Sequence, residues 1–145
     1  MPGMLGDYRH PAHINAALLL IRIAASIVFI YHGSAILFGS FGGPGPQAFA
    51  AFIHQPPVVG YLVGLAQFAG GIAILTGVLF RIGALSLVIV MIGAISIVHL
   101  GHGFSVAHNG MEFALTQGLV ALALLLSGPG QFSLNPLLPA ALRKL

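Results

Sequence analysis

The sequence contains very little charge. Its 145 residues include five Lys and Arg and two Asp and Glu, which together make up 5% of the chain. A soluble domain carries about 25% charged residues because its surface faces water, whereas 58% of this chain is hydrophobic. The sparse charge excludes a water-soluble globular domain and predicts that membrane lipid covers most of the surface. It also excludes nucleic acid as a partner, because nucleic-acid-binding proteins cluster many basic residues on one face.

Cysteine is absent from the sequence. Its absence excludes disulfides, thiolate metal sites and cysteine nucleophiles. Phosphate-binding loops and nucleophile elbows are missing as well. The two acidic residues, Asp7 and Glu112, lie on opposite sides of the membrane in the topology derived below. They cannot act together on one bond, so the sequence predicts no catalytic residue.

Long apolar runs take the place of the missing charge. Four of them lie at 16–38, 58–80, 82–100 and 109–127. Because a helix rises 1.5 Å per residue, about 20 apolar residues cross the hydrocarbon core, and the last run needs a turn from the preceding loop to approach that length. No run alternates as a membrane β-strand does. The sequence therefore predicts an all-α integral membrane four-helix bundle, a single domain over 1–145.

The connections between the runs differ in length. Gly and Pro residues are dense between the first two runs, which excludes an unbroken helix there. A short amphipathic turn is expected at 47–53. The second and third runs are expected to join tightly around Arg81.

The few cations are placed asymmetrically. Lys and Arg occur in the segments before the first run, between the second and third, and after the fourth, at Arg9, Arg81, Arg143 and Lys144. The other two loops contain neither residue. Because Lys and Arg mark the cytoplasmic side of a membrane, the pattern predicts that both termini are cytoplasmic.

One cation lies inside an apolar run. Arg22 is about two turns into the first run. Its long side chain can reach the headgroups by snorkelling. Alternatively, it pairs with a buried carboxylate or binds an anionic group of a ligand.

A buried amide is expected in the second run. Gly60, Gly64, Gln67 and Gly71 share one helical face. Glycines allow another helix to approach closely, and an amide in such a seam can hydrogen-bond across it. We interpret this face mainly as a packing surface, with Gln117 of the fourth run as a candidate partner for Gln67.

Histidines gather at the end of the bundle opposite to the cations. His32 and His99 end the first and third runs, His102 and His108 lie in the loop that follows, and Glu112 begins the fourth run. Such a set can bind zinc, copper or iron, and one histidine near the membrane surface can ligate a haem or a pigment. His99 and His102 are separated by a glycine, so their rings need not share a face. The alternative is that these groups hydrogen-bond to loops or to a partner, with Glu112 favoured by the helix dipole.

Several short motifs follow one another along the chain. They comprise Arg22, His32-Gly33, Gly70-Gly71, Leu75, Gly77, Arg81, Ala94, His99, Gly110, Glu112, Gly128-Pro129-Gly130 and Ser133-Leu134. In this order and spacing the chain resembles the DoxX family of small four-helix bacterial and archaeal membrane proteins, over roughly 18–137. The resemblance implies a location in the bacterial or archaeal cytoplasmic membrane.

Three positions depart from the family pattern. Ile36 stands where the family usually has lysine, Gln67 where it has glutamate, and Asn135 where it has aspartate. Gln keeps the shape and hydrogen bonding of Glu but removes the charge and the proton site. Balanced loss of charge would preserve the fold while weakening proton or ion chemistry.

The resemblance implies an association with membrane oxidoreductases, because the family includes a subunit of an archaeal thiosulfate:quinone oxidoreductase. The neutral positions favour a subunit without its own catalytic activity, within a larger redox or energy-transducing complex that serves electron transport. Its partners would be membrane lipid and other membrane subunits.

Two alternatives remain open. The first is a quinone-linked oxidoreductase subunit whose ligand pocket is lined by Arg22, His32, Gln67 and Glu112. The second is a subunit that holds a haem, pigment or metal through His32, His99, His102 or His108. Solute transport is disfavoured, because no run is clearly broken in the middle of the membrane.

Overall fold

The computed structural model describes residues 11–145, and every secondary-structure element in that range is helical. The prediction of an all-α fold is confirmed. The helices are α1 (Ala12–Phe38), α2 (Gly45–Phe52), α3 (Pro57–Thr76), α4 (Phe80–Gly93) and α5 (Glu112–Ser127). From Gly93 the α4 ribbon continues through a π-helical segment, Ala94–His99, into a 3-10 turn, Leu100–His102.

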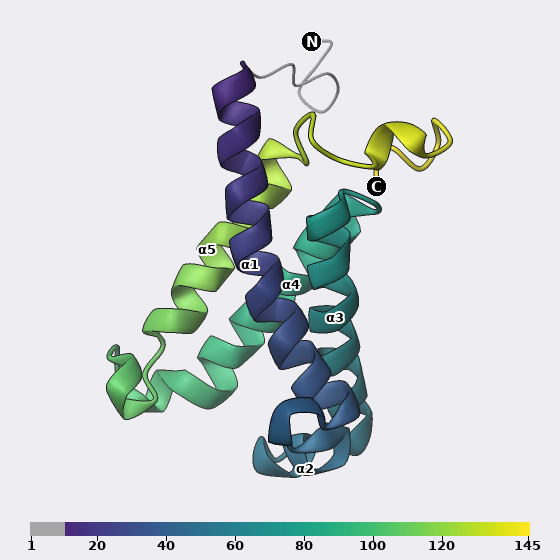
Figure 1. The fold of residues 1–145 in the computed structure, drawn as a ribbon. Coiled ribbons are helices and arrows are strands. Elements are labelled where there is room, and N and C mark those ends of the chain that lie inside the picture. The colour runs from purple at the N-terminus through teal and green to yellow at the C-terminus, as the bar shows by residue number, and fades with distance from the viewer. Residues whose placement is uncertain (1–10) are drawn as a thin grey trace.

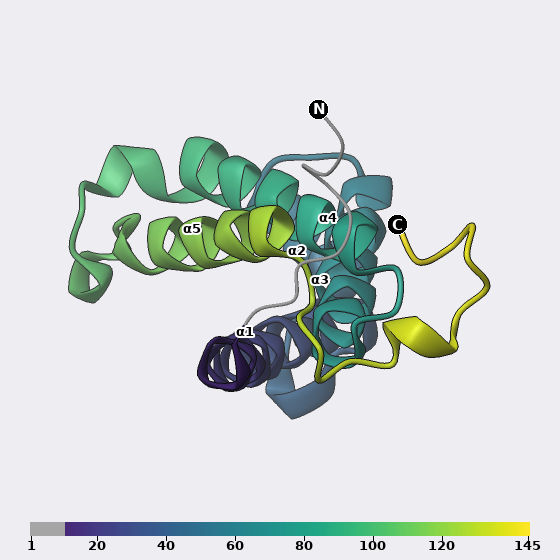
Figure 2. The same ribbon diagram turned by 90° about the horizontal axis from the view of Figure 1, so that it is seen from above.

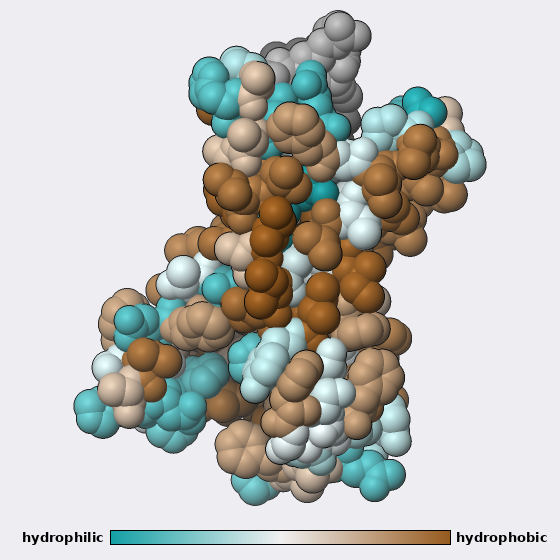
Figure 3. All heavy atoms as spheres, in the orientation of Figure 1, coloured by the Kyte–Doolittle hydropathy of each residue, from teal (hydrophilic) through white to brown (hydrophobic). Residues whose placement is uncertain are grey.

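Three of these helices are long and apolar enough to cross a membrane. They comprise 27 residues in α1, 20 in α3 and 23 in the continuous Phe80–His102 helix, while α5 is a shorter apolar helix. Large apolar side chains such as Leu20, Ile27 and Ile89 are exposed along them. Figure 3 shows apolar residues across the middle of one face, with hydrophilic residues gathered toward its ends. Lipid therefore contacts these helices. A fourth crossing and the cytoplasmic placement of both termini stay predictions.

The helix ends follow glycine and proline. Pro11 precedes α1, and Gly39 closes it in the left-handed conformation. Gly77 closes α3 in the same way, with φ of 81°, a backbone conformation that glycine adopts without steric cost. The expected tight join between these helices is present, but it lies at 77–79 and not around Arg81, which is the second residue of α4.

The last helix does not borrow a turn from the loop before it. It begins at Glu112 because Asn109 is left-handed, with φ of 63°, and separates α5 from the 3-10 turn Val106–His108. The expected helical extension to 109 is therefore wrong. The short turn expected at 47–53 is present as α2.

The helices form a ring in which each long helix contacts the next. α1 packs on α3, α3 on α4, α4 on α5, and α5 returns to α1. Figure 2 shows α4 and α5 running side by side, with α1 and α3 next to them. The core between them contains Phe29, Ile74, Leu87 and Leu124, each less than 2% exposed.

The contact of α1 with α3 depends on residues without side chains. A Cβ on Gly71 would lie 2.8 Å from Ile30, and one on Gly64 would lie 3.0 Å from Leu37. On the α1 side, a Cβ on Gly33 would lie 2.7 Å from the Cα of Phe68. Such close approach of backbones is how apolar helices associate in lipid.

The pair α4–α5 diverges from α1–α3 at one end of the molecule. Figure 1 shows the lower halves of α4 and α5 leaning away from α3, while α2 folds beneath α1 and α3. At the other end the start of α1 lies beside the segment after α5, where the amide nitrogen of Gln131 donates to Asn15 Oδ1 at 2.9 Å.

Candidate functional site

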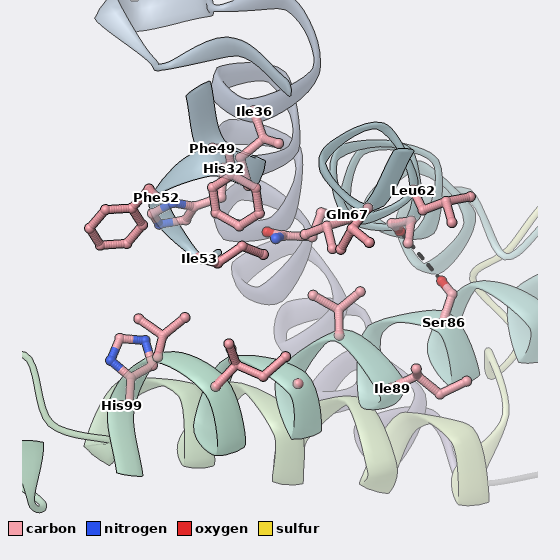
Figure 4. A pocket seen from close by; sticks show the side chains of 18 residues that line it. His32, Ile36, Phe49, Phe52, Ile53, Leu62, Gln67, Ser86, Ile89 and His99 are labelled. Carbon is pink, nitrogen blue, oxygen red and sulfur yellow. Dashed lines mark hydrogen bonds between the residues drawn. The ribbon is translucent and has the colours of Figure 1, made fainter. Parts of the chain in front are cut away.

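A cavity of about 550 Å³ lies where the two helix pairs diverge. It is enclosed by the last turns of α1, by α2, by one side of α3, and by α4 with its π-helical extension. Figure 4 shows α2 side chains on one side of the space and the α4 helix on the other, with Gln67 between them. A cavity of this size suits one small organic ligand.

Most of the cavity wall is apolar. Residues such as Phe49, Ile53 and Val90 line it, together with four polar side chains, His32, Gln67, Ser86 and His99. The Ser86 hydroxyl donates to the backbone oxygen of Gly83 at 2.7 Å, so it is satisfied within its own helix. An apolar wall with a few polar groups is the usual composition of a ligand site.

Gln67 is the buried polar group of this cavity. Its side chain is only 7% exposed, and within residues 11–145 its amide makes no hydrogen bond. Figure 4 shows the amide end pointing into the space between α1, α2 and α4. The glycines on the same face of α3 pack against neighbouring backbone, which leaves this amide at the edge of the cavity.

His99 borders the cavity from the end of the π-helical segment. Its Nδ1 lies 2.7 Å from the backbone oxygen of Asn109. A π-helix has one more residue per hydrogen-bonded ring than an α-helix, and such segments occur frequently at functional sites. Here four of its residues, Ala94, Ile97, Val98 and His99, line the cavity.

The mouth of the cavity faces lipid. Phe52, Leu62, Ile89 and Ile97 belong to its lining and are all more than half exposed. These residues come from three different helices and from the π-helical segment, so they form a rim on the apolar outer surface. A molecule dissolved in the bilayer can therefore reach the cavity without crossing water.

Arg22 lies outside the cavity and ties three segments together. Its guanidinium donates to the backbone oxygens of Ile74 (2.6 Å), Leu75, Pro129 (2.7 Å) and Phe132 (2.7 Å). It also lies over the Phe80 ring, 5.8 Å from the centroid.

Arg22 is 1% exposed, so it does not snorkel to the headgroups, and its partners are backbone oxygens and not a carboxylate. Binding of an anionic ligand group by Arg22 stays a prediction. The last four carbonyls of a helix have no intrahelical partner. All four last carbonyls of α3 have outside donors. The Gly77 amide donates to the carbonyl of Ala73, and the Leu134 amide donates to that of Thr76. The Arg22 guanidinium donates to the carbonyls of Ile74 and Leu75.

Glu112 is the first residue of α5, and its side chain binds the loop that precedes this helix. Its Oε2 accepts a hydrogen bond of 2.9 Å from the backbone amide of Val106. It does not line the cavity. Of the four residues predicted to bind a ligand, the structure thus places His32 and Gln67 on the cavity, and Arg22 and Glu112 elsewhere.

The predicted metal ligands are divided in the same way. His32 and His99 line the cavity, whereas His102 and His108 lie outside it, and His102 Nδ1 bonds to the Val98 oxygen at 2.9 Å. Throughout residues 11–145, no three His, Cys, Asp or Glu side chains are grouped closely enough to hold a metal ion. A single axial histidine for a haem or pigment is not tested by this observation and stays a prediction.

Gln117 is not the partner of Gln67. In the part of the chain that the structure describes, its buried Oε1 has no hydrogen-bond partner, and it does not line the cavity. The two amides therefore occupy different places in the bundle. His99 was predicted as a metal or cofactor ligand but not as part of the quinone site. The hint in the sequence was that His99 ends its run at the same end of the bundle as His32.

Comparison with known proteins gives one match. The family model for DoxX matches residues 17–100, which is more than half of the chain. No curated protein and no solved structure matches the chain. The matched range contains Arg22 and every residue that lines the cavity, whereas α5 lies beyond it.

Proposed function

Because this chain belongs to the DoxX family and is an integral membrane protein, we propose that it is a membrane subunit of a redox complex and holds a quinone-type ligand in the cavity beside Gln67. The observation that carries the proposal is the cavity itself. It has apolar walls, opens toward lipid and contains one buried amide without a hydrogen bond.

The unbonded amide favours a ligand with a polar head. The Gln67 amide borders the cavity and makes no hydrogen bond within residues 11–145, so a carbonyl or hydroxyl on the ligand would supply one, worth about 0.5–1.5 kcal/mol. A quinone carries two such groups on a planar ring with an apolar tail. The ring suits the aromatic side chain of Phe49, and the tail suits the lipid-facing mouth, which Phe52 borders.

The polar groups of the cavity support a subunit rather than a complete enzyme. Gln67, Ser86, His32 and His99 can bind and orient a ligand, but their side chains do not exchange electrons. Electrons for the ligand would therefore come from a partner. Extraction in a mild detergent should recover the chain with a protein that carries a flavin, haem or iron–sulfur centre. Recovery of a lone chain that retains full activity would contradict this part of the proposal.

Ligand binding is tested by comparing Gln67, which lines the cavity, with Gln117, which does not. We expect Gln67→Leu to weaken binding of a short-chain benzoquinone about 5- to 10-fold, because it removes the one buried hydrogen-bonding group. Gln117→Leu is the matched control, because it removes a similar amide outside the cavity. Equilibrium dialysis against the detergent-solubilised protein, with empty micelles as the blank, measures both. Equal affinities for Gln67→Leu and the unaltered protein would refute the assignment of this site.

A haem or pigment is the second candidate ligand. It is favoured by His99, whose Nδ1 is bonded to a backbone oxygen while its other nitrogen remains available. Axial histidines are commonly held in this way. The absorption spectrum of the purified protein tests it, and a colourless preparation that still binds benzoquinone would leave the quinone as the ligand.

A further inference from the structure

The hydrogen bond of His99 determines which nitrogen carries the proton. Its Nδ1 lies 2.7 Å from the Asn109 backbone oxygen, and a carbonyl oxygen only accepts hydrogen bonds. Nδ1 must therefore be the donor. In the neutral imidazole the other nitrogen, Nε2, then presents a lone pair. Figure 4 shows the ring standing off the helix, with one nitrogen on the side of the cavity.

The loop that supplies this carbonyl is itself held in place. Amides of the loop donate to its own backbone, from Gly110 to Ser105 at 2.8 Å and from Met111 to Gly103 at 3.0 Å. The bond from the Val106 amide to Glu112 Oε2 closes the same loop from the α5 side. The Asn109 oxygen is thus fixed relative to the end of the π-helical segment, and the tautomer of His99 is built into the fold.

A fixed acceptor at the cavity distinguishes two forms of a ligand. A lone pair on Nε2 accepts a hydrogen bond from a hydroxyl group but gains nothing from a carbonyl oxygen. Gln67 does not make this distinction, because its amide both donates and accepts. We infer that the cavity prefers the hydroxyl-bearing, reduced form of its ligand, a hydroquinone, over the quinone. The inference rests on the proposed function and adds the form of the ligand that the site retains.

The experiment compares a short-chain benzoquinone, its hydroquinone and the dimethyl ether of that hydroquinone. Their dissociation constants are measured by anaerobic equilibrium dialysis on the full chain in detergent. The hydroquinone should bind about five-fold more tightly than the other two, which is the effect of one additional hydrogen bond. His99→Phe keeps a planar ring without nitrogen and should abolish this preference. His102→Phe is the matched control, since His102 also bonds to a backbone oxygen through Nδ1 but does not line the cavity.

The outcomes separate the inference from the proposed function. If the unaltered protein binds none of the probes, the proposed function fails and the inference fails with it. If quinone and hydroquinone bind equally, or if His99→Phe retains the preference, the inference is overturned while the site stands. Nitrogen-15 NMR of labelled histidine in the unaltered protein gives an independent measurement of the tautomer, which does not depend on the folding of any variant. A neutral His99 with its proton on Nε2 would also overturn the inference.

Discussion

Replacement of Arg22 is the sharpest test of how the bundle is held together. The guanidinium makes four hydrogen bonds to backbone oxygens, two at the end of α3 and two in the segment after α5. A lysine ammonium has three donors around one nitrogen and cannot reproduce a planar fork. Arg22→Lys must therefore leave at least one of these oxygens without its partner.

The expected loss follows from the number of bonds. A hydrogen bond to a charged group contributes about 1.5–3 kcal/mol, and an orphaned buried group adds about 1–3 kcal/mol. We expect Arg22→Lys to lower the free energy of unfolding by about 3 kcal/mol. For Arg22→Met we expect about 3–5 kcal/mol. All four bonds are then lost, but the cost of burying a charge, several kcal/mol, is removed.

The assay is unfolding in mixed micelles by titration with SDS, followed by far-ultraviolet circular dichroism because the chain has no Trp. Arg81→Lys is the control, since Arg81 is less buried and its guanidinium makes one hydrogen bond, to the Leu125 oxygen at 2.7 Å. One lysine donor can replace that bond, so we expect a loss below about 1 kcal/mol. If Arg22→Lys destabilises the protein no more than Arg81→Lys does, the four-bond account of Arg22 is wrong.

Two further predictions concern packing and orientation. Gly33→Ala should destabilise the bundle by about 1–3 kcal/mol, because the new Cβ would overlap the α3 backbone. A Cβ on Gly93 would meet no neighbouring atom within 4 Å, so Gly93→Ala should stabilise the bundle by up to about 1 kcal/mol. Equal effects of the two changes in the same SDS titration would contradict the packing described for α1 and α3. Because the chain lacks cysteine, single cysteines report the topology directly. His54 lies in the connection between α2 and α3, on the side predicted to be outside. A membrane-impermeant maleimide should label His54→Cys in intact cells and Lys144→Cys only after permeabilisation, and the reverse pattern would refute a cytoplasmic C-terminus.

The helices could be predicted from the sequence because lipid makes composition decisive. An apolar run long enough to cross a bilayer has few alternatives to a helix, so the positions of α1, α3 and the Phe80–His102 helix were expected. Their ends were less predictable. Gly77 was available as a signal for the end of α3. Because apolar residues continue past it, composition alone placed the end of the predicted run beyond the true end of the helix.

The candidate site was predictable only in part. His32 and Gln67 were expected to face a ligand, and both line the cavity. The cavity depends on the divergence of α4 from α3 and on the π-helical segment Ala94–His99, which no Pro or repeated pattern marks. The partners of Arg22 were equally unpredictable, since two of them are separated from it by 107 and 110 residues along the chain.

The length of α5 has a consequence for the membrane around the protein. Its 16 residues extend about 24 Å, whereas the hydrocarbon core of a typical bilayer is about 30 Å thick. For α5 to cross, as the sequence predicts, the bilayer must thin beside it, or the exposed Phe104 and Val106 of the preceding loop must enter the interface. Each ångström of such mismatch costs a fraction of a kcal/mol. The protein should therefore be most stable in thin bilayers, and its α5 side should attract neighbouring proteins that are equally short.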